Sequence, residues 1–211
     1  LKTNQVMPNH SPDNPIAIIL GLIKEQTEGK VANPQFWKPA GLINRISPSR
    51  KVQNWLKTAT SLTAKLRHLC PNLEVIVLSE KYEVPLLSEA QKLNLKPDEE
   101  AWVRCVVLKC HDQHWIYART IIPAMSSTNP WHELQQLGNK PLGEILFEMP
   151  KTQRSDFEFS KDLLSLWPYL NCHLNNTQEN KKFAYARRSV FEQKGAPLLL
   201  TEVFLPQLIE N

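Results

Sequence analysis

Charged side chains lie inside apolar segments whose composition is typical of β-strands. Four of them are arginines: Arg104, Arg119, Arg187 and Arg188. A single carboxylate, Glu202, lies within the apolar segment 198–205. An ion inside a dry sheet costs on the order of several kcal/mol unless another group compensates its charge. These charges therefore need partners, and the nature of the partners decides the chemistry.

Two interpretations of these charges are open. In the first, Arg104 or Arg188 pairs with Glu202 across neighbouring strands and forms a structural ion pair without chemistry. In the second, three arginines (Arg104, Arg119 and one of the adjacent pair) face inward, and a ligand supplies the missing negative charge. Because guanidinium groups bind carboxylates in bidentate fashion, the ligand predicted by the second interpretation carries carboxylate groups.

Other catalytic and metal-binding patterns are weak. His111 and His114 flank a predicted hairpin turn without a cysteine or carboxylate partner, which favours solvated side chains over metal ligands. The G-x-S-x-G, P-loop and G-x-G-x-x-G motifs are absent from the sequence. The four cysteines include no C-x-x-C pair, so we expect neither zinc nor a disulfide framework, and we expect Cys105 and Cys110 to be buried thiols.

Composition narrows the class of protein further. The net charge of +4 comes from 25 basic and 21 acidic residues that are dispersed along the 211-residue chain, whereas nucleic-acid binding needs a concentrated basic face. No apolar run approaches the roughly 20 residues of a membrane-spanning helix. The apolar stretch 15–23 lacks the basic flank and cleavage site of a signal peptide. We therefore expect a cytoplasmic protein that neither binds nucleic acid nor inserts into a membrane.

The pattern of apolar residues predicts helices first and strands afterwards. Helical spacing extends over 52–69, with a break near Thr60 and Ser61, whose hydroxyls suit a helix N-cap. Shorter helices are predicted at 131–137 and 142–147. Strands are predicted at 73–79, 101–110, 115–122, 157–159, 183–191 and 198–205.

This order of elements predicts an α+β fold. Short connections between consecutive strands favour antiparallel pairing, so we expect a single antiparallel β-sheet of about six strands with helices packed on one face and an enclosed ligand site. Residues 1–50 are rich in proline and are predicted to be an N-terminal extension with one short apolar element at 16–23. Residues 51–211 are predicted to form the domain, with an exposed loop at 171–182.

Six short segments resemble those of the chorismate lyases, also called chorismate pyruvate-lyases. They occur in the order of that family and extend from about Trp55 to Pro206. The segments are 60–63, 101–104, 117–123, 137–147, 186–189 and 198–206. The resemblance implies an antiparallel sheet with a closed internal site. It also implies the conversion of chorismate to 4-hydroxybenzoate and pyruvate, the first step in supplying a quinone-ring precursor, without a metal or organic cofactor.

The resemblance also implies roles for particular residues. Arg104 matches the arginine that binds the ring carboxylate, and Glu202 matches the carboxylate that faces the ring hydroxyl. The backbone N–H groups of Leu62 and Leu142 match positions that hold the same ring carboxylate beneath flap-like segments. Leu62 replaces a methionine of a well-known member, and because the role is a main-chain one, this change should affect packing rather than chemistry.

Chorismate carries a second carboxylate, on its enolpyruvyl group. The cation that binds it is inferred from the faces of the predicted strands and not from the resemblance. On this ground we expect Arg119 or Arg188 to bind the enolpyruvyl carboxylate.

An alternative from another class is a non-catalytic effector-binding module, because transcription regulators contain modules of the same fold. Such regulators carry an N-terminal winged-helix domain, and residues 1–50 are too short and too rich in proline to form one. A third interpretation is a structural or interaction domain with a simple ion pair. The expected partners are the substrate chorismate and the product 4-hydroxybenzoate, bound by a monomer.

Overall fold

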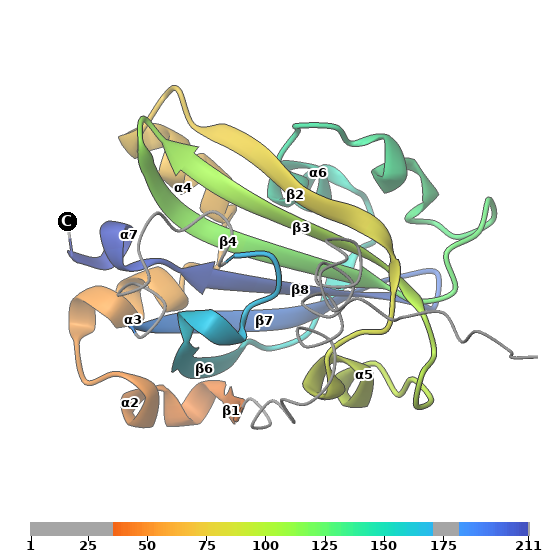
Figure 1. Ribbon diagram of the computed structural model, residues 1–211, viewed down its shortest axis with the longest axis horizontal. Coiled ribbons are helices and arrows are strands. Elements are labelled where there is room, and N and C mark those ends of the chain that lie inside the picture. Colours follow the sequence, from red (N-terminus) through yellow and green to blue (C-terminus); the bar gives the residue numbers. More distant parts are fainter. Residues whose placement is uncertain (1–35, 171–181, 211) are drawn as a thin grey trace, which may run out of the picture. The chain divides into compact units, whose positions relative to one another are not determined.

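The computed structural model describes residues 36–170 and 182–210, which belong to a unit that begins at Pro34. Within this part of the chain, eight strands form one antiparallel sheet in the order β1-β6-β7-β8-β4-β3-β2, with β5 paired to β7 (Figure 1). The strands are β1 (Lys38–Pro39), β2 (Glu74–Glu83), β3 (Ala101–Cys110), β4 (Gln113–Ile122), β5 (Gln153–Arg154), β6 (Glu158–Leu163), β7 (Phe183–Gln193) and β8 (Ala196–Phe204).

The expected α+β fold with an antiparallel sheet is confirmed. Six of the strands are the predicted ones, and the additional two, β1 and β5, have two residues each. Two residues are too few to show an alternating pattern. These short strands therefore depend on pairing with a neighbouring strand rather than on their own sequence.

The helices of the described part are short. They are α2 (Ile43–Ile46), α3 (Arg50–Leu56), α4 (Leu62–Leu69), α5 (Leu87–Lys92), α6 (Leu142–Glu148) and α7 (Pro206–Glu210), with 3₁₀ turns η1 (Ala40–Leu42), η2 (His132–Gln136) and η3 (Leu164–Leu166). The predicted helix 52–69 is broken as expected, because the Ser61 side chain accepts a hydrogen bond from the backbone N–H of Ala64 at 3.3 Å and caps α4. Helix α5 was not predicted.

Side chains alternate between two faces of the sheet, and both faces are covered. We call the face that carries Arg104 and Glu202 the cavity face, and the face that carries Arg119 and Arg188 the opposite face. Residues of α3, α4, α6 and α7 pack in two apolar clusters with residues of the cavity face. Residues at the end of α5 and in η3 pack in a third cluster with residues of the opposite face. The expectation that helices cover one face is therefore incomplete.

Part of the predicted N-terminal extension belongs to the packed unit. Residues of β1 pair with β6, and the Ile43 side chain is 3% exposed within an apolar cluster that includes Trp55. The sequence pattern misses this packing because proline and polar residues dominate residues 1–50. The predicted element at 16–23 and nearly all of the predicted loop at 171–182 lie outside the described residues.

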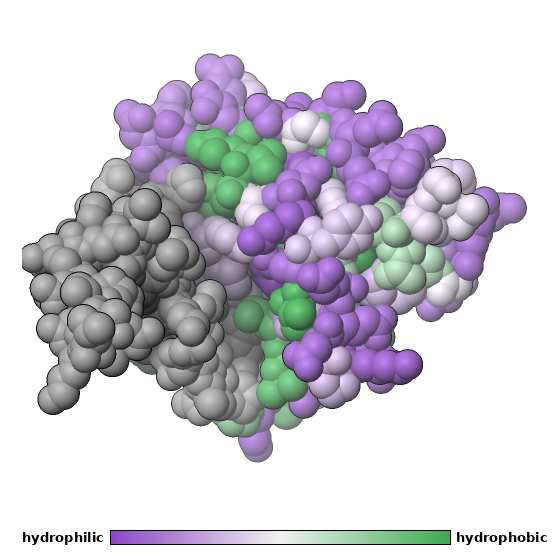
Figure 2. Space-filling view, turned by 45° about the vertical axis from the view of Figure 1, so that its right-hand side comes forward, coloured by the Kyte–Doolittle hydropathy of each residue, from purple (hydrophilic) through white to green (hydrophobic). Residues whose placement is uncertain are grey.

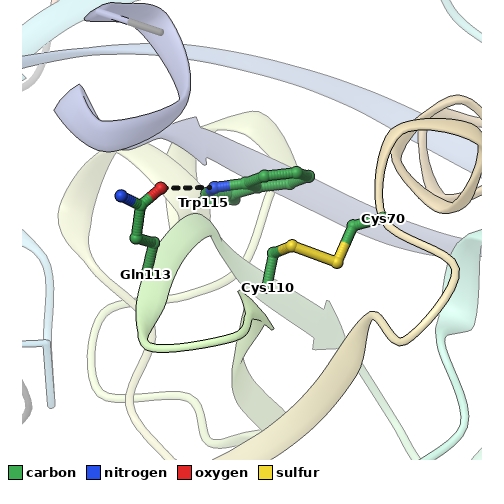
Figure 3. The surroundings of a disulfide bond; sticks show 4 residues. All are labelled: Cys70, Cys110, Gln113 and Trp115. Carbon is green, nitrogen blue, oxygen red and sulfur yellow. Dashed lines mark hydrogen bonds between the residues drawn. A yellow bond between two sulfur atoms is a disulfide. The ribbon is translucent and has the colours of Figure 1, made fainter.

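A disulfide bond joins Cys70 to Cys110, which corrects the expectation of a buried thiol at Cys110 and of a chain without disulfides (Figure 3). Cys70 follows the last residue of α4 and Cys110 is the last residue of β3, so packing of α4 against the end of the sheet brings them together. The separation of 40 residues explains why local spacing rules do not detect the pair. Cys105 is a free buried thiol, as expected.

The visible surface of the described part is mainly hydrophilic, with smaller hydrophobic groups between the polar ones (Figure 2). None of the helices in the described segments is both long and apolar enough to cross a membrane.

Candidate active site

A small cavity lies on the cavity face, between the sheet and the first residues of α4 and α6. Its floor comes from β3, β4 and β8, and Thr63, Leu142 and Gly143 line its other side. The charged residues that line it are Arg104, Lys140 and Glu202. The volume of the cavity is about 30 Å³, whereas ligand pockets usually measure roughly 300–1,000 Å³. The two helix starts therefore close tightly over the polar residues.

Strand register brings Arg104 and Glu202 to the same cavity. Arg104 of β3 lies opposite Thr120 of β4, and Glu202 of β8 lies opposite Ala118 of β4. Residues 118 and 120 of one strand point to the same face. The two charged side chains therefore flank β4 on the cavity face.

Arg104 is held at one end of the cavity by two acceptors. Its side chain is buried, and it donates hydrogen bonds to the Glu80 carboxylate and to the backbone carbonyl of Gly138. Gly138 has a φ of +55°, a left-handed conformation that favours glycine and turns the chain after η2. Two of the five N–H donors of a guanidinium group are thereby assigned, which leaves further donors for an anion.

Glu202 is paired with Arg187, whereas the first of the two interpretations of the sequence paired it with Arg104 or Arg188. Nε of Arg187 donates to Oε2 of Glu202 at 2.6 Å, and the two residues lie opposite each other on β7 and β8. The sequence placed one member of the Arg187–Arg188 pair inward without deciding which one. Register decides it, because only the residue directly across from Glu202 shares its face.

Leu62 and Leu142 are the first residues of α4 and α6. The first N–H groups of a helix have no carbonyl partner within the helix, so these two positions offer backbone donors. Leu142 lines the cavity, and Thr63 does so next to the buried Leu62. The helix starts approach closely, since a Cβ added at Gly143 would lie 3.0 Å from Oγ1 of Thr63.

Arg119 does not reach the cavity and lies on the opposite face. It donates to Glu89 at 2.9 Å and to Glu83 at 2.8 Å, and it contacts the Cys105 sulfur at 3.2 Å. Burial alone would lower the pKa of Arg119, but the Glu89 carboxylate raises this pKa well above its ordinary value. We expected Arg119 at the enolpyruvyl carboxylate, but Arg104 lies opposite Thr120, and this register places Arg119 on the other side of β4 from the cavity.

Arg188 also lies on the opposite face and does not line the cavity. Its Nε donates to Oε2 of Glu158 at 2.7 Å, and its Nη1 donates to the backbone carbonyl of Ser88 at 2.9 Å. We also expected Arg188 at the enolpyruvyl carboxylate, but it lies opposite Thr201, one residue before Glu202, and therefore on the face away from the cavity.

The predicted surplus of buried cations over acids is also wrong. Each of the four arginines has an acid partner, and four of these acids come from outside the strands predicted to carry the charges. They are Glu80, Glu83, Glu89 and Glu158. Glu80 lies one residue beyond the predicted strand 73–79, and Glu89 lies in the helix α5 that was not predicted. The sequence count omitted them because they meet the arginines only through tertiary contacts.

Lys140 is the cavity residue that sequence reasoning missed. Among the described residues, Lys140 and Arg104 are the two cations that line the cavity. No carboxylate of the described residues lies within ion-pair distance of Lys140. The segment 137–147 was considered for its resemblance and for a predicted helix, and its lysine was not considered as a ligand for the substrate. A charge count limited to strands cannot find a lysine in a loop.

One cluster of side chains has the residue types of a metal site but cannot bind a metal ion. Cys70, Cys110 and His111 offer ligand atoms within 4.8 Å of one another, and they are the group of this kind among the described residues. The two sulfurs are bonded to each other, so neither can bind a metal as a thiolate.

The fold places an arginine and a glutamate at a small cavity enclosed by two helix starts. Residues 31–211 match the family model described as chorismate lyase, and the chain therefore belongs to the chorismate lyase family. Members of this family are lyases, and the chain is an enzyme of this class.

Curated relatives agree with this assignment. A probable chorismate pyruvate-lyase of Hydrogenovibrio crunogenus is 46% identical over 169 residues, which cover 80% of this chain and 89% of that protein. A probable chorismate pyruvate-lyase of Halorhodospira halophila is 34% identical, with coverage of 83% and 92%. The chorismate pyruvate-lyase of Pectobacterium atrosepticum is 33% identical, with coverage of 74% and 77%.

Among solved structures, a GntR-family transcriptional regulator from Bacillus cereus is similar with a TM-score of 0.47 and 11% identity, covering 64% of this chain and 92% of that one. The C-terminal domain of a histidine utilization repressor from Pseudomonas syringae has a TM-score of 0.45 and 11% identity, with coverage of 64% and 93%. Similarity at this level does not bear on function.

Proposed function

We propose that the protein converts chorismate to 4-hydroxybenzoate and pyruvate, which supplies a quinone-ring precursor in the cytoplasm. Membership of the chorismate lyase family supports the reaction. The observation that carries the proposal is the placement of Arg104 and Glu202 on one cavity beneath the starts of α4 and α6. These are the residues and elements that the resemblance associates with the substrate.

The reaction is balanced without a redox step. The C–O bond between the ring and the enolpyruvyl group breaks, and the electron pair of the neighbouring C4–H bond completes the aromatic ring as the proton leaves C4. The departing enolpyruvate takes up one proton and becomes pyruvate. Because the ring becomes aromatic, the site has to orient a flexible dianion and stabilise the negative charge that develops on the leaving group.

In this proposal, Arg104 binds the ring carboxylate with the donors that Glu80 and Gly138 do not use. The backbone N–H groups of Leu62 and Leu142 complete the site for that carboxylate. Glu202 faces the ring hydroxyl and accepts its hydrogen bond. Aligned donors and acceptors at both ends of the ring hold the C4 hydrogen and the ether in a fixed position.

Lys140 takes the role that the sequence analysis assigned to Arg119 or Arg188. The enolpyruvyl carboxylate needs a cation at the cavity, and both of those arginines lie on the opposite face with acids of their own. Lys140 lines the cavity and has no acid partner among the described residues. An ammonium group placed there stabilises the carboxylate of the leaving enolpyruvate.

A cavity of about 30 Å³ is smaller than either the substrate or the aromatic product, so α4 and α6 have to separate for both to pass. Release of pyruvate from chorismate by the purified protein tests the proposal. We expect pyruvate and 4-hydroxybenzoate in equal amounts, and we expect added 4-hydroxybenzoate to inhibit turnover because its exit requires the same opening. Binding of chorismate without pyruvate release would contradict the proposal and would favour a non-catalytic ligand-binding module.

A further inference from the structure

Arg187 occupies a place in the site that the resemblance does not assign. Its side chain is 2% exposed, and its Nε donates to Oε2 of Glu202 at 2.6 Å. Its Nη1 donates to the backbone carbonyl of Thr58 at 2.6 Å and to that of Leu56 at 3.2 Å. The guanidinium group also lies over the ring of Phe157, 4.5 Å from its centroid. Three acceptors and an aromatic face hold the group in one position.

The two carbonyls belong to the segment that leads into the cover of the cavity. Leu56 is the last residue of α3, Thr58 follows it, and Leu62 begins α4. A single buried guanidinium group therefore joins the glutamate on the cavity floor to the backbone that precedes the cover. Arg187 itself does not line the cavity, so it acts through Glu202 and through this segment.

We propose that Arg187 is a positioning residue for the proposed reaction: it orients the Glu202 carboxylate toward the substrate and couples that orientation to closure of α4. This inference rests on the proposed function. It assigns Arg187 no contact with the reacting atoms. Loss of the guanidinium group lets the carboxylate rotate and leaves two backbone carbonyls without their donor, so the transition state loses stabilisation while the ring carboxylate site at Arg104 is unchanged.

The neighbouring Arg188 provides a matched control. It is also buried, it also pairs with a glutamate and a backbone carbonyl, but it lies on the opposite face. Replacement of either arginine removes a buried ion pair, and both variants should lose stability. Only the replacement of Arg187 should change the chemistry.

The test compares Arg187→Gln and Arg187→Lys with Arg188→Gln and Arg188→Lys in pyruvate release, with thermal unfolding measured alongside. Arg187→Gln should lower kcat by roughly 100-fold or more with KM changed by less than about threefold. Arg187→Lys keeps the charge and should recover part of kcat. The two Arg188 variants should keep kcat within about threefold of the wild type under conditions in which they are folded.

A double variant separates positioning from a general structural effect. Glu202→Gln alone should lower kcat while retaining affinity for 4-hydroxybenzoate. If Arg187 acts through Glu202, the loss of kcat in Arg187→Gln/Glu202→Gln will equal that of the more severe single variant rather than the product of both losses.

Additive losses, an unchanged kcat in Arg187→Gln, or an equal loss of kcat in Arg188→Gln would overturn the inference and leave the proposed function intact. The absence of pyruvate release by the wild-type protein would overturn both.

Discussion

Individual residues of the same charge have different surroundings in this protein, and these surroundings distinguish substrate binding from stability. Arg104 lines the cavity, whereas Arg119 is equally buried but is enclosed by acids on the opposite face. Sequence alone makes the two look equivalent, since each is one arginine in an apolar strand.

Replacement of Arg104 tests this distinction. Arg104→Ala removes the cation for the ring carboxylate and leaves Glu80 as an unpaired acid at that end of the cavity. We expect kcat/KM for pyruvate release to fall on the order of 10²–10³-fold, the effect of losing one partner of a buried charge pair. Arg119→Lys serves as the control and should lower the melting temperature while kcat/KM stays within about threefold. Retention of wild-type kcat/KM in Arg104→Ala would exclude the proposed role.

Lys140 is exposed, so its contribution should be smaller and should depend on salt. Lys140→Ala removes the cation proposed for the enolpyruvyl carboxylate, and we expect KM for chorismate to rise about tenfold with a smaller change in kcat. Raising the ionic strength should increase KM of the wild type more than that of the variant, because salt screens exposed charges. Lys109→Ala, which removes a surface lysine paired with Asp112, is the control. An unchanged KM in Lys140→Ala would contradict its role.

At the scale of elements, the close approach of α4 and α6 decides how well the cavity is covered. Gly143 faces Thr63, and an exposed ion pair between Arg67 and Glu144 at 3.0 Å joins the same two helices. Space rather than backbone conformation restricts this position, because an added Cβ would press on the Thr63 hydroxyl and this side chain would have to shift.

Gly143→Ala should therefore weaken the cover. A Cβ at 3.0 Å from Oγ1 of Thr63 forces the two helix starts apart, and we expect the Kd for 4-hydroxybenzoate to rise by about tenfold. Gly41→Ala, where a Cβ would meet no atom within 4 Å, should leave this Kd unchanged. The additional replacement Thr63→Ala should restore part of the affinity lost in Gly143→Ala. Equal affinities in Gly143→Ala and the wild type, measured by calorimetry, would show that the approach is not needed.

The disulfide bond fixes the other end of α4 to the end of β3. A cross-link over 40 residues reduces the conformational entropy of the unfolded chain, which corresponds to about 4 kcal/mol in the loop-closure model. Cys110→Ser, or treatment of the wild type with a dithiol reductant, should lower the free energy of unfolding by up to about this amount in urea titrations. Reductant should have no further effect on Cys110→Ser. Identical urea midpoints with and without reductant in the wild type would contradict a stabilising disulfide.

At the scale of the whole molecule, two buried polar layers lie on opposite faces of one sheet. The cavity face combines Arg104, Arg187 and Glu202 with a small cavity, whereas the arginines of the opposite face are paired with Glu83, Glu89 and Glu158. The first layer is the one that we propose binds the substrate, and the second connects α5 and the strand edges to the centre of the sheet. Acid stability should depend mainly on the second layer.

The pH dependence of stability follows from the pKa shifts on the opposite face. Burial would raise the pKa of Glu83, but hydrogen bonding from Tyr169 and the charge of Arg119 lower it. Burial would likewise raise the pKa of Glu158, but hydrogen bonds from Lys92 and Arg188 lower it. A carboxyl group with a lowered pKa in the folded state stabilises the fold above its ordinary pKa, and this stability is lost as pH falls through the lowered value.

The free energy of unfolding should therefore decrease as pH falls below about 4.3, the ordinary value for glutamate. Burial raises the pKa of Asp162, which works in the opposite direction and reduces the net slope. Urea titrations between pH 7 and pH 3 measure the effect, and Glu158→Gln should show a weaker dependence than the wild type. A free energy of unfolding that is constant over this range would contradict the assignment.

The elements and the family could be predicted from the sequence because both depend on local patterns. Apolar runs between turn residues located the six longer strands, a serine marked the start of α4, and the motif order pointed to the chorismate lyases. The placement of Arg104 and Glu202 on one face required the register of β3, β4 and β8. The two-residue strands, helix α5 and the packed segment before residue 50 have no such local pattern and were missed.

The sequence by itself determined where the longer strands lie, which residues within one strand share a face, and the family that the chain resembles. Only the tertiary structure decided that Arg187 rather than Arg188 meets Glu202, that Arg119 lies away from the cavity, and that Cys70 meets Cys110. The physical reason is that alternation is a property of one strand, whereas an ion pair or a disulfide depends on register and packing between segments that lie far apart in the chain.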